Sequence, residues 1–183
     1  MEAEMKMLKS RQEVENRIRA LAAEITADYS NLTEDDPLLV LCTLRGAVFF
    51  FADLVRALEV PCEIDFLKIH SYGEDTRPVG APVFDLGENI ALNGRHVLIV
   101  EDIVDTGATM DTMLRLFREK GAADIRICTL LDKPVRRRSE FRETVKPDYI
   151  GFRIPDLFVI GWGLDYADRY RLLKDIMYLD FQG

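Results

Sequence analysis

The spacing of apolar positions changes several times along the chain, and each spacing predicts one kind of element. Residues 14–29 carry apolar side chains at helical intervals, which predicts an amphipathic helix. The unbroken apolar run 37–44 predicts a buried strand, and the apolar segment 46–59 predicts a helix after it. Residues 63–72 alternate between apolar and polar side chains, which predicts another strand.

The second half of the chain predicts more elements of the same two kinds: a strand at 96–100, a helix at about 108–120, a strand at 124–132, and short strand-like runs at 148–152 and 157–165. Strands that alternate with helices predict an α/β fold with a mainly parallel central sheet flanked by helices. Ligands bind beyond the carboxyl ends of such strands. We therefore expect the ends of 37–44, 96–100 and 124–132 to meet at one site.

The regular pattern stops between residues 73 and 94. This stretch is rich in glycine, holds two prolines and shows little periodicity. Irregular loops of this length in a compact domain are often functional lids, and a lid is our interpretation. A plain surface hairpin is the alternative.

Composition narrows the class of protein. The chain has 183 residues, of which 48% are hydrophobic, and this suits one compact domain with a sizeable core. No apolar run reaches the roughly 20 residues that a membrane span needs. The charged N-terminus also lacks the apolar core of a signal peptide. We expect a cytoplasmic protein without a membrane partner.

Charge and cysteine content bear on two further classes. The net charge of −8 argues against a non-specific nucleic-acid-binding protein, because such proteins carry a basic surface. An anionic small substrate stays possible, since a local site can oppose the overall charge. Cys42, Cys62 and Cys128 lie far apart, so we expect buried thiols and neither metal ligands nor disulfides.

The candidate chemistry concentrates in the segment VLIVEDIVDTGATM, residues 97–110. Gly107 lets a ligand approach the backbone closely, and the start of the next helix offers unpaired N–H groups and a positive dipole end. Thr106 and Thr109 add hydroxyl donors. These residues predict a phosphate site that is neither a Walker loop nor a dinucleotide fingerprint, because the Walker lysine and the G-x-G-x-x-G pattern are absent.

Three acids precede this phosphate site. Glu101 and Asp102 suit a ribose diol or Mg²⁺, since carboxylates accept hydrogen bonds from hydroxyls and bind hard cations. Asp105 lies apart from that pair, in the turn, and could act as a general base. The segment therefore predicts a phosphorylated sugar with free hydroxyls as a ligand. An acidic cap ahead of the helix is the alternative.

The order of four hydrophobic residues, two acids, two hydrophobic residues and Asp-Thr-Gly-x-Thr resembles the 5-phosphoribosyl-1-pyrophosphate (PRPP) signature of type I phosphoribosyltransferases. Asp105 is typical of their hypoxanthine/guanine branch. The segments TLRGA, HSYG, LLDKP and IPDLFVIGWGLDYADRYR resemble that branch's pyrophosphate loop, mobile catalytic loop, purine-reading strand end and C-terminal motif. The resemblance covers roughly residues 37–173.

For the fold, the resemblance implies a single domain over residues 1–183. Its core would cover about 35–135, and a small hood would form from about 1–34 and 136–183. Family members form dimers or tetramers, so a homodimer or homotetramer is implied as well.

For function, the resemblance implies purine salvage: the phosphoribosyl group of PRPP joins hypoxanthine, and also guanine, to give IMP or GMP and pyrophosphate, with Mg²⁺ required. Asp105 would accept the purine proton, and Glu101 and Asp102 would hold the ribose hydroxyls and metal. The 5′-phosphate would bind the backbone and hydroxyls of Asp105, Thr106, Gly107, Ala108 and Thr109.

The resemblance also assigns the purine and pyrophosphate sites. Lys133 would donate to the 6-oxo group, Phe158 would stack on the base, and the Val159 backbone would pair with the base edge. Asp165 would lie near that edge and the second metal. The pyrophosphate would bind Arg45, Gly46, Ser71, Tyr72 and Arg171. A solvated Lys133 and an ordinary core Phe158 are the alternatives. Arg136, Arg137 and Arg138 have no counterpart and are interpreted as a solvated basic run.

One position departs from the family pattern. The usual lysine of the pyrophosphate loop is Arg45 here, which offers a planar fork instead of a point charge. The peptide before this residue is often cis in the family, so we expect Leu44–Arg45 to be strained or cis.

Two other functions stay open at this point. One is a phosphoribosyltransferase for another base, such as xanthine. The other is a PRPP-sensing regulator that binds RNA and has lost catalysis, although Asp105, Lys133 and the net charge of −8 argue against it.

Overall fold

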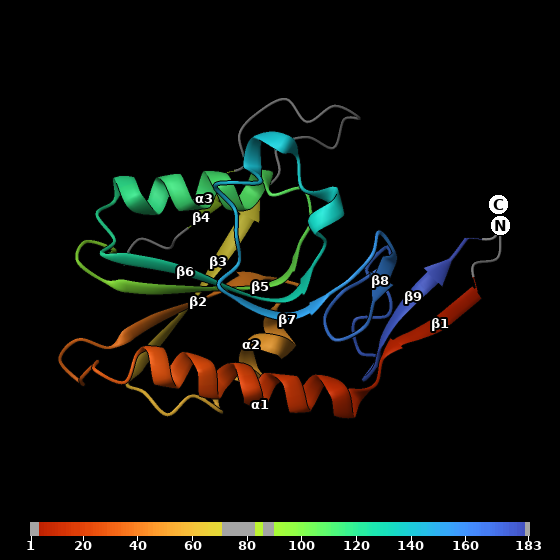
Figure 1. Cartoon of the computed structure of the whole chain (residues 1–183), viewed down its shortest axis with the longest axis horizontal. Coiled ribbons are helices and arrows are strands. Elements are labelled where there is room, and N and C mark those ends of the chain that lie inside the picture. The colour runs from red at the N-terminus through yellow and green to blue at the C-terminus, as the bar shows by residue number, and fades with distance from the viewer. Residues whose placement is uncertain (1–3, 71–82, 86–89, 182–183) are drawn as a thin grey trace.

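The computed structural model describes residues 4–70, 83–85 and 90–181 of the chain. Within these ranges lie a six-stranded sheet, in the order β4-β3-β2-β5-β6-β7, and a three-stranded sheet, in the order β1-β9-β8 (Figure 1). The strands are β1 Glu4–Lys9, β2 Leu38–Leu44, β3 Cys62–His70, β4 Val83–Asp85, β5 His96–Val104, β6 Asp124–Asp132, β7 Tyr149–Arg153, β8 Phe158–Ile160 and β9 Ile176–Asp180. The helices are α1 Arg11–Asp28, α2 Val48–Val55 and α3 Ala108–Glu119, with 3-10 turns at Pro134–Arg136 and Ser139–Phe141.

The larger sheet is mainly parallel, as the sequence predicts. β3, β2, β5, β6 and β7 run parallel to one another, and β4 pairs antiparallel with β3 at the edge. β5 continues four residues beyond its predicted end, because its pairing with β6 persists to Val104 opposite Asp132. The acids Glu101 and Asp102 therefore belong to the strand itself.

Helices cover both faces of this sheet. α1 and α2 lie on one face and α3 on the other (Figure 1). β2 shows why: Leu38, Val40 and Cys42 join the core under α1 and α2, and the alternate residues Leu39 and Leu41 join the core under α3. A strand that is buried on both faces needs a continuous apolar sequence, which the run 38–42 provides.

The smaller sheet lies beside the start of α1, where the N- and C-terminal parts of the chain meet (Figure 1). β1 pairs with β9, and β9 pairs with β8, all antiparallel. This sheet forms the hood that the family resemblance implies. α1, which follows β1, packs against α2 and β7 in the main layers, and β7 pairs with β6. The hood sheet itself takes only β1, β8 and β9.

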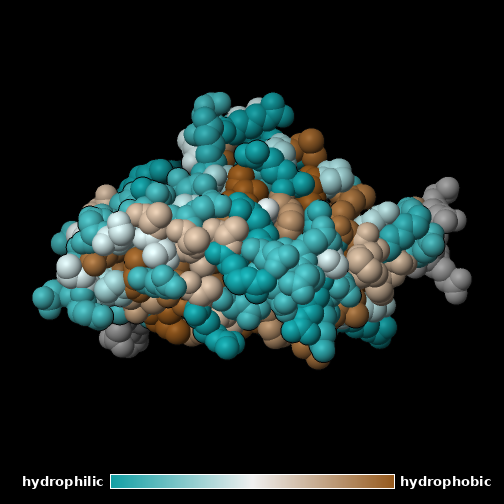
Figure 2. Space-filling view, turned by 60° about the horizontal axis from the view of Figure 1, so that its bottom comes forward, coloured by the Kyte–Doolittle hydropathy of each residue, from teal (hydrophilic) through white to brown (hydrophobic). Residues whose placement is uncertain are grey.

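The surface carries both hydrophilic and hydrophobic residues. Figure 2 shows a face that is mostly hydrophilic, with hydrophobic residues in separate groups. In the described part of the chain, no helix is long and apolar enough to cross a membrane.

Candidate active site

Three strand ends form the candidate site at the carboxyl edge of the larger sheet. β2 ends at Leu44 and is followed by a cis peptide bond between Leu44 and Arg45, as expected. The neighbouring strand β5 runs into the segment 105–109, and β6 ends at Asp132, directly before Lys133. Because β2 pairs with β5 and β5 with β6, the three ends are adjacent.

The phosphate side of the site is a cavity of about 230 Å³ at the start of α3, lined by Glu101, Ile103, Val104, Asp105, Thr106, Gly107, Thr109 and Met110. Gly107 is the cap of α3 and has a φ of 88°, a left-handed conformation that favours glycine. The first amides of a helix have no partners within it, so they can bind an anion. Ala108 is the first residue of α3 and is not among the cavity's lining residues.

Glu101 is a carboxyl group inside this cavity. Burial, and then the nearby charge of Asp102, raise the pKa of Glu101 well above its ordinary value. The Thr43 hydroxyl lies 2.7 Å from Glu101 Oε1 and 3.0 Å from the Val100 carbonyl oxygen. A buried carboxyl group with a raised pKa needs a cation or hydroxyl donors to stabilise its ionised form.

Asp102 lies next to Glu101 and against the loop after β2. Its Oδ1 accepts a hydrogen bond from the Ile103 N–H at 2.7 Å, and burial raises its pKa. The carboxylate lies directly against Gly46, where a Cβ atom would overlap Asp102 Oδ2. Glu101 lines the cavity at the start of α3 and Asp102 contacts the loop after β2, while the two carboxyl groups also interact with each other.

The C-terminal segment brings a cluster of charges to that loop. Arg45 Nη2 donates to Asp168 Oδ1 at 2.9 Å, although both side chains are about 70% exposed. Arg171 Nη2 lies 2.7 Å from Asp165 Oδ1 and 3.3 Å from Asp168 Oδ1. Arg171 Nη1 donates to the Gly163 carbonyl at 2.7 Å, which anchors this arginine to its own segment. Arg45 and Arg171 are thus linked through Asp168.

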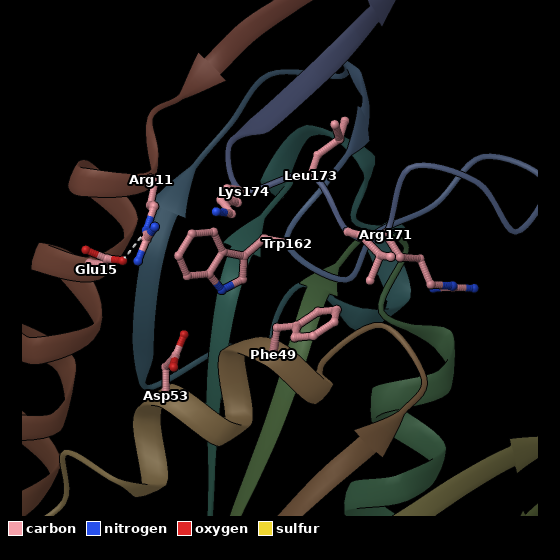
Figure 3. Close-up of a pocket in the computed structure, with 9 residues that line it drawn as sticks. Arg11, Glu15, Phe49, Asp53, Trp162, Arg171, Leu173 and Lys174 are labelled. Carbon is pink, nitrogen blue, oxygen red and sulfur yellow. Dashed lines mark hydrogen bonds and ion pairs between the residues drawn. The ribbon is translucent and has the colours of Figure 1, made fainter.

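A separate cavity of about 360 Å³ lies behind this cluster, between α1, α2 and the C-terminal segment. Figure 3 shows the Arg171 guanidinium directed away from the residues around Trp162. The Trp162 indole is 7% exposed, and its Nε1 has no hydrogen-bond partner among the described residues. Arg171 lines this cavity, but its guanidinium points away from it toward Asp165 and Asp168.

A second cavity at this edge has a volume of about 650 Å³. We call it the base cavity, after the predicted roles of Lys133 and Phe158, and it is lined by Ile103, Asp105, Lys133, Arg136, Asp156, Leu157, Phe158, Val159, Leu164, Leu179, Asp180 and Phe181. Lys133 is only 6% exposed, which rules out a solvated surface lysine. Phe158 is 43% exposed and meets Tyr166 and Phe181 edge to face, so it is not an ordinary core residue. Asp105 and Ile103 line both this cavity and the phosphate cavity.

The interpretation of residues 136–138 as a solvated run is wrong for Arg137. This side chain is buried and donates to the carbonyls of Asp105, Val104 and Val145 and to Asp132 Oδ1. It therefore holds the backbone of the acidic turn in place. The sequence pattern does not reveal this role of Arg137, because its hydrogen-bond acceptors come from three separate segments of the chain.

Comparison with known proteins decides the family. The phosphoribosyl transferase domain matches residues 4–169 of the chain. The chain belongs to the phosphoribosyltransferase family. The hypoxanthine-guanine phosphoribosyltransferase of Bacillus subtilis (strain 168) is 40% identical over 171 residues, which cover 93% of this chain and 91% of that protein. The hypoxanthine phosphoribosyltransferase of Haemophilus influenzae is 43% identical over 169 residues, covering 91% of this chain and 90% of that protein.

A solved structure supports the same relationship. A variant of hypoxanthine phosphoribosyltransferase from Trypanosoma cruzi, in a ternary substrates complex, superposes with a TM-score of 0.86. It is 38% identical, and the match covers 95% of this phosphoribosyltransferase and 94% of that chain. The family and the fold predicted from the sequence are both confirmed.

Some predicted site residues of this phosphoribosyltransferase lie outside the described residues. Other residues that contact the site were not predicted from the sequence. Ser71, Tyr72 and most of the 73–94 stretch lie outside the described residues. Thr43, Asp156 and Asp168 were not predicted, although they contact Glu101, Lys133 and Arg45. An acid in the C-terminal motif was a usable signal for Asp168, whereas a lone threonine in an apolar strand gave none for Thr43.

Proposed function

We propose that this phosphoribosyltransferase transfers the 5-phosphoribosyl group of PRPP to hypoxanthine, and also to guanine, and releases pyrophosphate. One observation carries the proposal: Asp105 lines both the phosphate cavity and the cavity that contains Lys133 and Phe158. A sugar phosphate in the first cavity and a base in the second would therefore meet beside Asp105. The similarity to enzymes named for this activity supports the same substrates.

The chemistry of the transfer suits the groups present. As the C1′–O bond to pyrophosphate breaks, positive charge grows on the ribose and negative charge on the leaving group. The attacking purine nitrogen must also lose a proton. We assign that proton to the Asp105 carboxylate, which stands between the two cavities and can act as general base.

Lys133 provides the basis for base selection. Its ammonium group only donates hydrogen bonds, so it favours a 6-oxo group over the amine of adenine. Because Lys133 is 6% exposed, an unmatched base would bury its ammonium group without the hydrogen-bond acceptor that a 6-oxo group supplies. Phe158 would stack on the base, and the Val159 backbone would pair with its edge.

Mg²⁺ is the cofactor that we propose. Glu101, Asp102 and Asp165 offer only oxygen donors, which a hard cation prefers. In the ranges that the structure describes, no three His, Cys, Asp or Glu side chains gather into a metal site, so oxygens of PRPP and water would complete the coordination. When bound, the cation would balance the charge of the pyrophosphate. Arg45, Gly46, Arg171, Ser71 and Tyr72 are the proposed contacts of that group.

Three wider assignments accompany this proposal. We infer a single domain, because α1 packs on the main sheet and follows directly after β1 of the hood sheet. A homodimer or homotetramer and a place in the cytoplasm are proposed from the family alone. A preference for xanthine is the alternative within the same chemistry, and it differs only at the purine contacts.

Product analysis tests the function. The protein is incubated with PRPP, Mg²⁺ and one of hypoxanthine, guanine, xanthine or adenine, and nucleotides are separated by chromatography. We expect IMP and GMP, with little XMP and no AMP. XMP as the main product would favour the alternative, and no nucleotide with any base would refute the proposal.

A further inference from the structure

Arg136 stands at the border between the base cavity and the acidic turn. It closes the 3-10 turn Pro134–Arg136, which begins directly after Lys133. Its Nε donates to Asp105 Oδ1 at 3.2 Å, and its Nη1 lies 3.6 Å from Asp156 Oδ2. The sequence pattern assigned no role to this residue.

Arg136 is part of a row of alternating charges around the base cavity. Asp156 Oδ1 lies 3.9 Å from Lys133 Nζ, so the row runs from Asp105 through Arg136 and Asp156 to Lys133. All four residues line the same cavity. The proposed general base and the proposed reader of the 6-oxo group are therefore joined through one arginine and one carboxylate.

The Asp105 carboxylate depends on Arg136 for its orientation. In the described part of the chain, Arg136 is the only side chain that donates a hydrogen bond to that carboxylate. Arg137 donates to the Asp105 backbone carbonyl instead, at 3.0 Å. Arg137 thus holds the turn, and Arg136 holds the carboxyl group that the turn carries.

We propose that Arg136 is a positioning residue for Asp105: it holds one carboxylate oxygen and leaves the other free to accept the purine proton. The inference rests on the proposed function and adds a residue to it. Asp156 contacts a second nitrogen of the guanidinium, so Arg136 lies between two carboxylates.

Substrate binding would strengthen this arrangement. The Arg136 and Asp105 side chains are 49% and 38% exposed, and exposed pairs contribute little because water screens them. A purine in the cavity displaces water and lowers the local dielectric, so the attraction between the two charges increases. Positioning then acts when the substrate is bound, which is when it affects the rate.

The inference is measurable as a split between kcat and KM. Removing Arg136 takes away the one side chain that, among the described residues, donates to the Asp105 carboxylate. A carboxylate that is no longer held would less often be placed to accept the purine proton, so kcat should fall while PRPP affinity stays unchanged.

The test compares R136Q and R136K with R138Q, a matched control because Arg138 is the exposed arginine two residues away and its side chain makes no contact with Asp105. We measure kcat and KM for hypoxanthine, and PRPP affinity by calorimetry. R136Q should lower kcat on the order of tenfold, less than the roughly 10²–10⁴ expected for loss of the general base itself. R136K should restore part of kcat, and R138Q should match wild type, with PRPP affinity unchanged throughout.

Two results would overturn the inference. One is an R136Q enzyme that matches R138Q in kcat and in KM for hypoxanthine. The other is a loss of rate that is accompanied by weaker PRPP binding and is not rescued by lysine, which is the signature of a purely structural role. A wild-type protein that makes no nucleotide would instead refute the proposed function, together with this inference.

Discussion

Asp168 Oδ1 accepts a hydrogen bond from Arg45 Nη2 at 2.9 Å, which ties the C-terminal segment to the loop after β2. The same oxygen lies 3.3 Å from Arg171 Nη2. Asp168 thus places a negative charge between the two arginines that we assign to pyrophosphate. The carboxylate must give way when that anion binds.

The first prediction concerns this competition. D168N should bind pyrophosphate more tightly than wild type, because the anion no longer displaces a carboxylate from both arginines. Exposed ion pairs contribute up to about 1 kcal/mol, so the gain should be at most about fivefold. Calorimetry with pyrophosphate measures it, with D35N as an exposed control distant in sequence. Equal or weaker binding by D168N would show that Asp168 supports the site instead of competing with its ligand.

The second prediction concerns the general base. D105N should keep PRPP binding but lower kcat by roughly 10²–10³, the range expected when a general base is lost. Steady-state kinetics gives kcat, and calorimetry gives PRPP affinity. Turnover near the wild-type value would remove Asp105 from the proton transfer.

The third prediction concerns selection of the base. K133Q should discriminate less between hypoxanthine and adenine, because the glutamine amide can accept a hydrogen bond from an amine as well as donate to an oxo group. The measurement is the ratio of kcat/KM for the two bases. A ratio equal to that of wild type would mean that another group reads position 6.

The fourth prediction concerns the contact between Gly46 and Asp102. G46A should disturb the site, since its methyl group would overlap the Asp102 carboxylate, and overpacking of this kind costs about 1–3 kcal/mol. The free energy of unfolding from urea titration measures the cost. In a double-mutant cycle, D102A should relieve most of it. Additive effects would show that the Gly46 backbone, and not the carboxylate, resists the side chain.

The fifth prediction concerns acid stability at the start of α1. The Ser10 N–H and hydroxyl lower the pKa of Glu13 to about 2, through the hydrogen bonds of a capping box. A lowered pKa stabilises the fold above the unfolded-state value of about 4.3 and loses this contribution as pH falls through the folded-state value. The Tm difference between wild type and E13Q should therefore be constant near pH 7 and shrink below about pH 4. A difference independent of pH would exclude ionised Glu13 as the cause.

Local patterns determined much of the fold. β6 has the predicted bounds 124–132, and α3 begins at Ala108 and ends one residue before its predicted end, because glycines bound it on both sides. The hood was expected from the family resemblance, but local patterns did not predict its strand pairing. β1 pairs with β9, Glu4 opposite Asp180, and a short sequence carries no information about so distant a partner. The extension of β5 to Val104 depended in the same way on its neighbour β6.

The sequence by itself determined the family, the fold class and the identity of the acidic turn, since a signature of consecutive residues is a local property. Only the tertiary structure decided how that turn is used. It placed Glu101 in the cavity at the start of α3 and Asp102 against Gly46, and it brought Arg136 to Asp105 and Asp168 to Arg45. These contacts join side chains from separate segments, and their geometry follows from strand register and packing, which no single stretch of sequence contains.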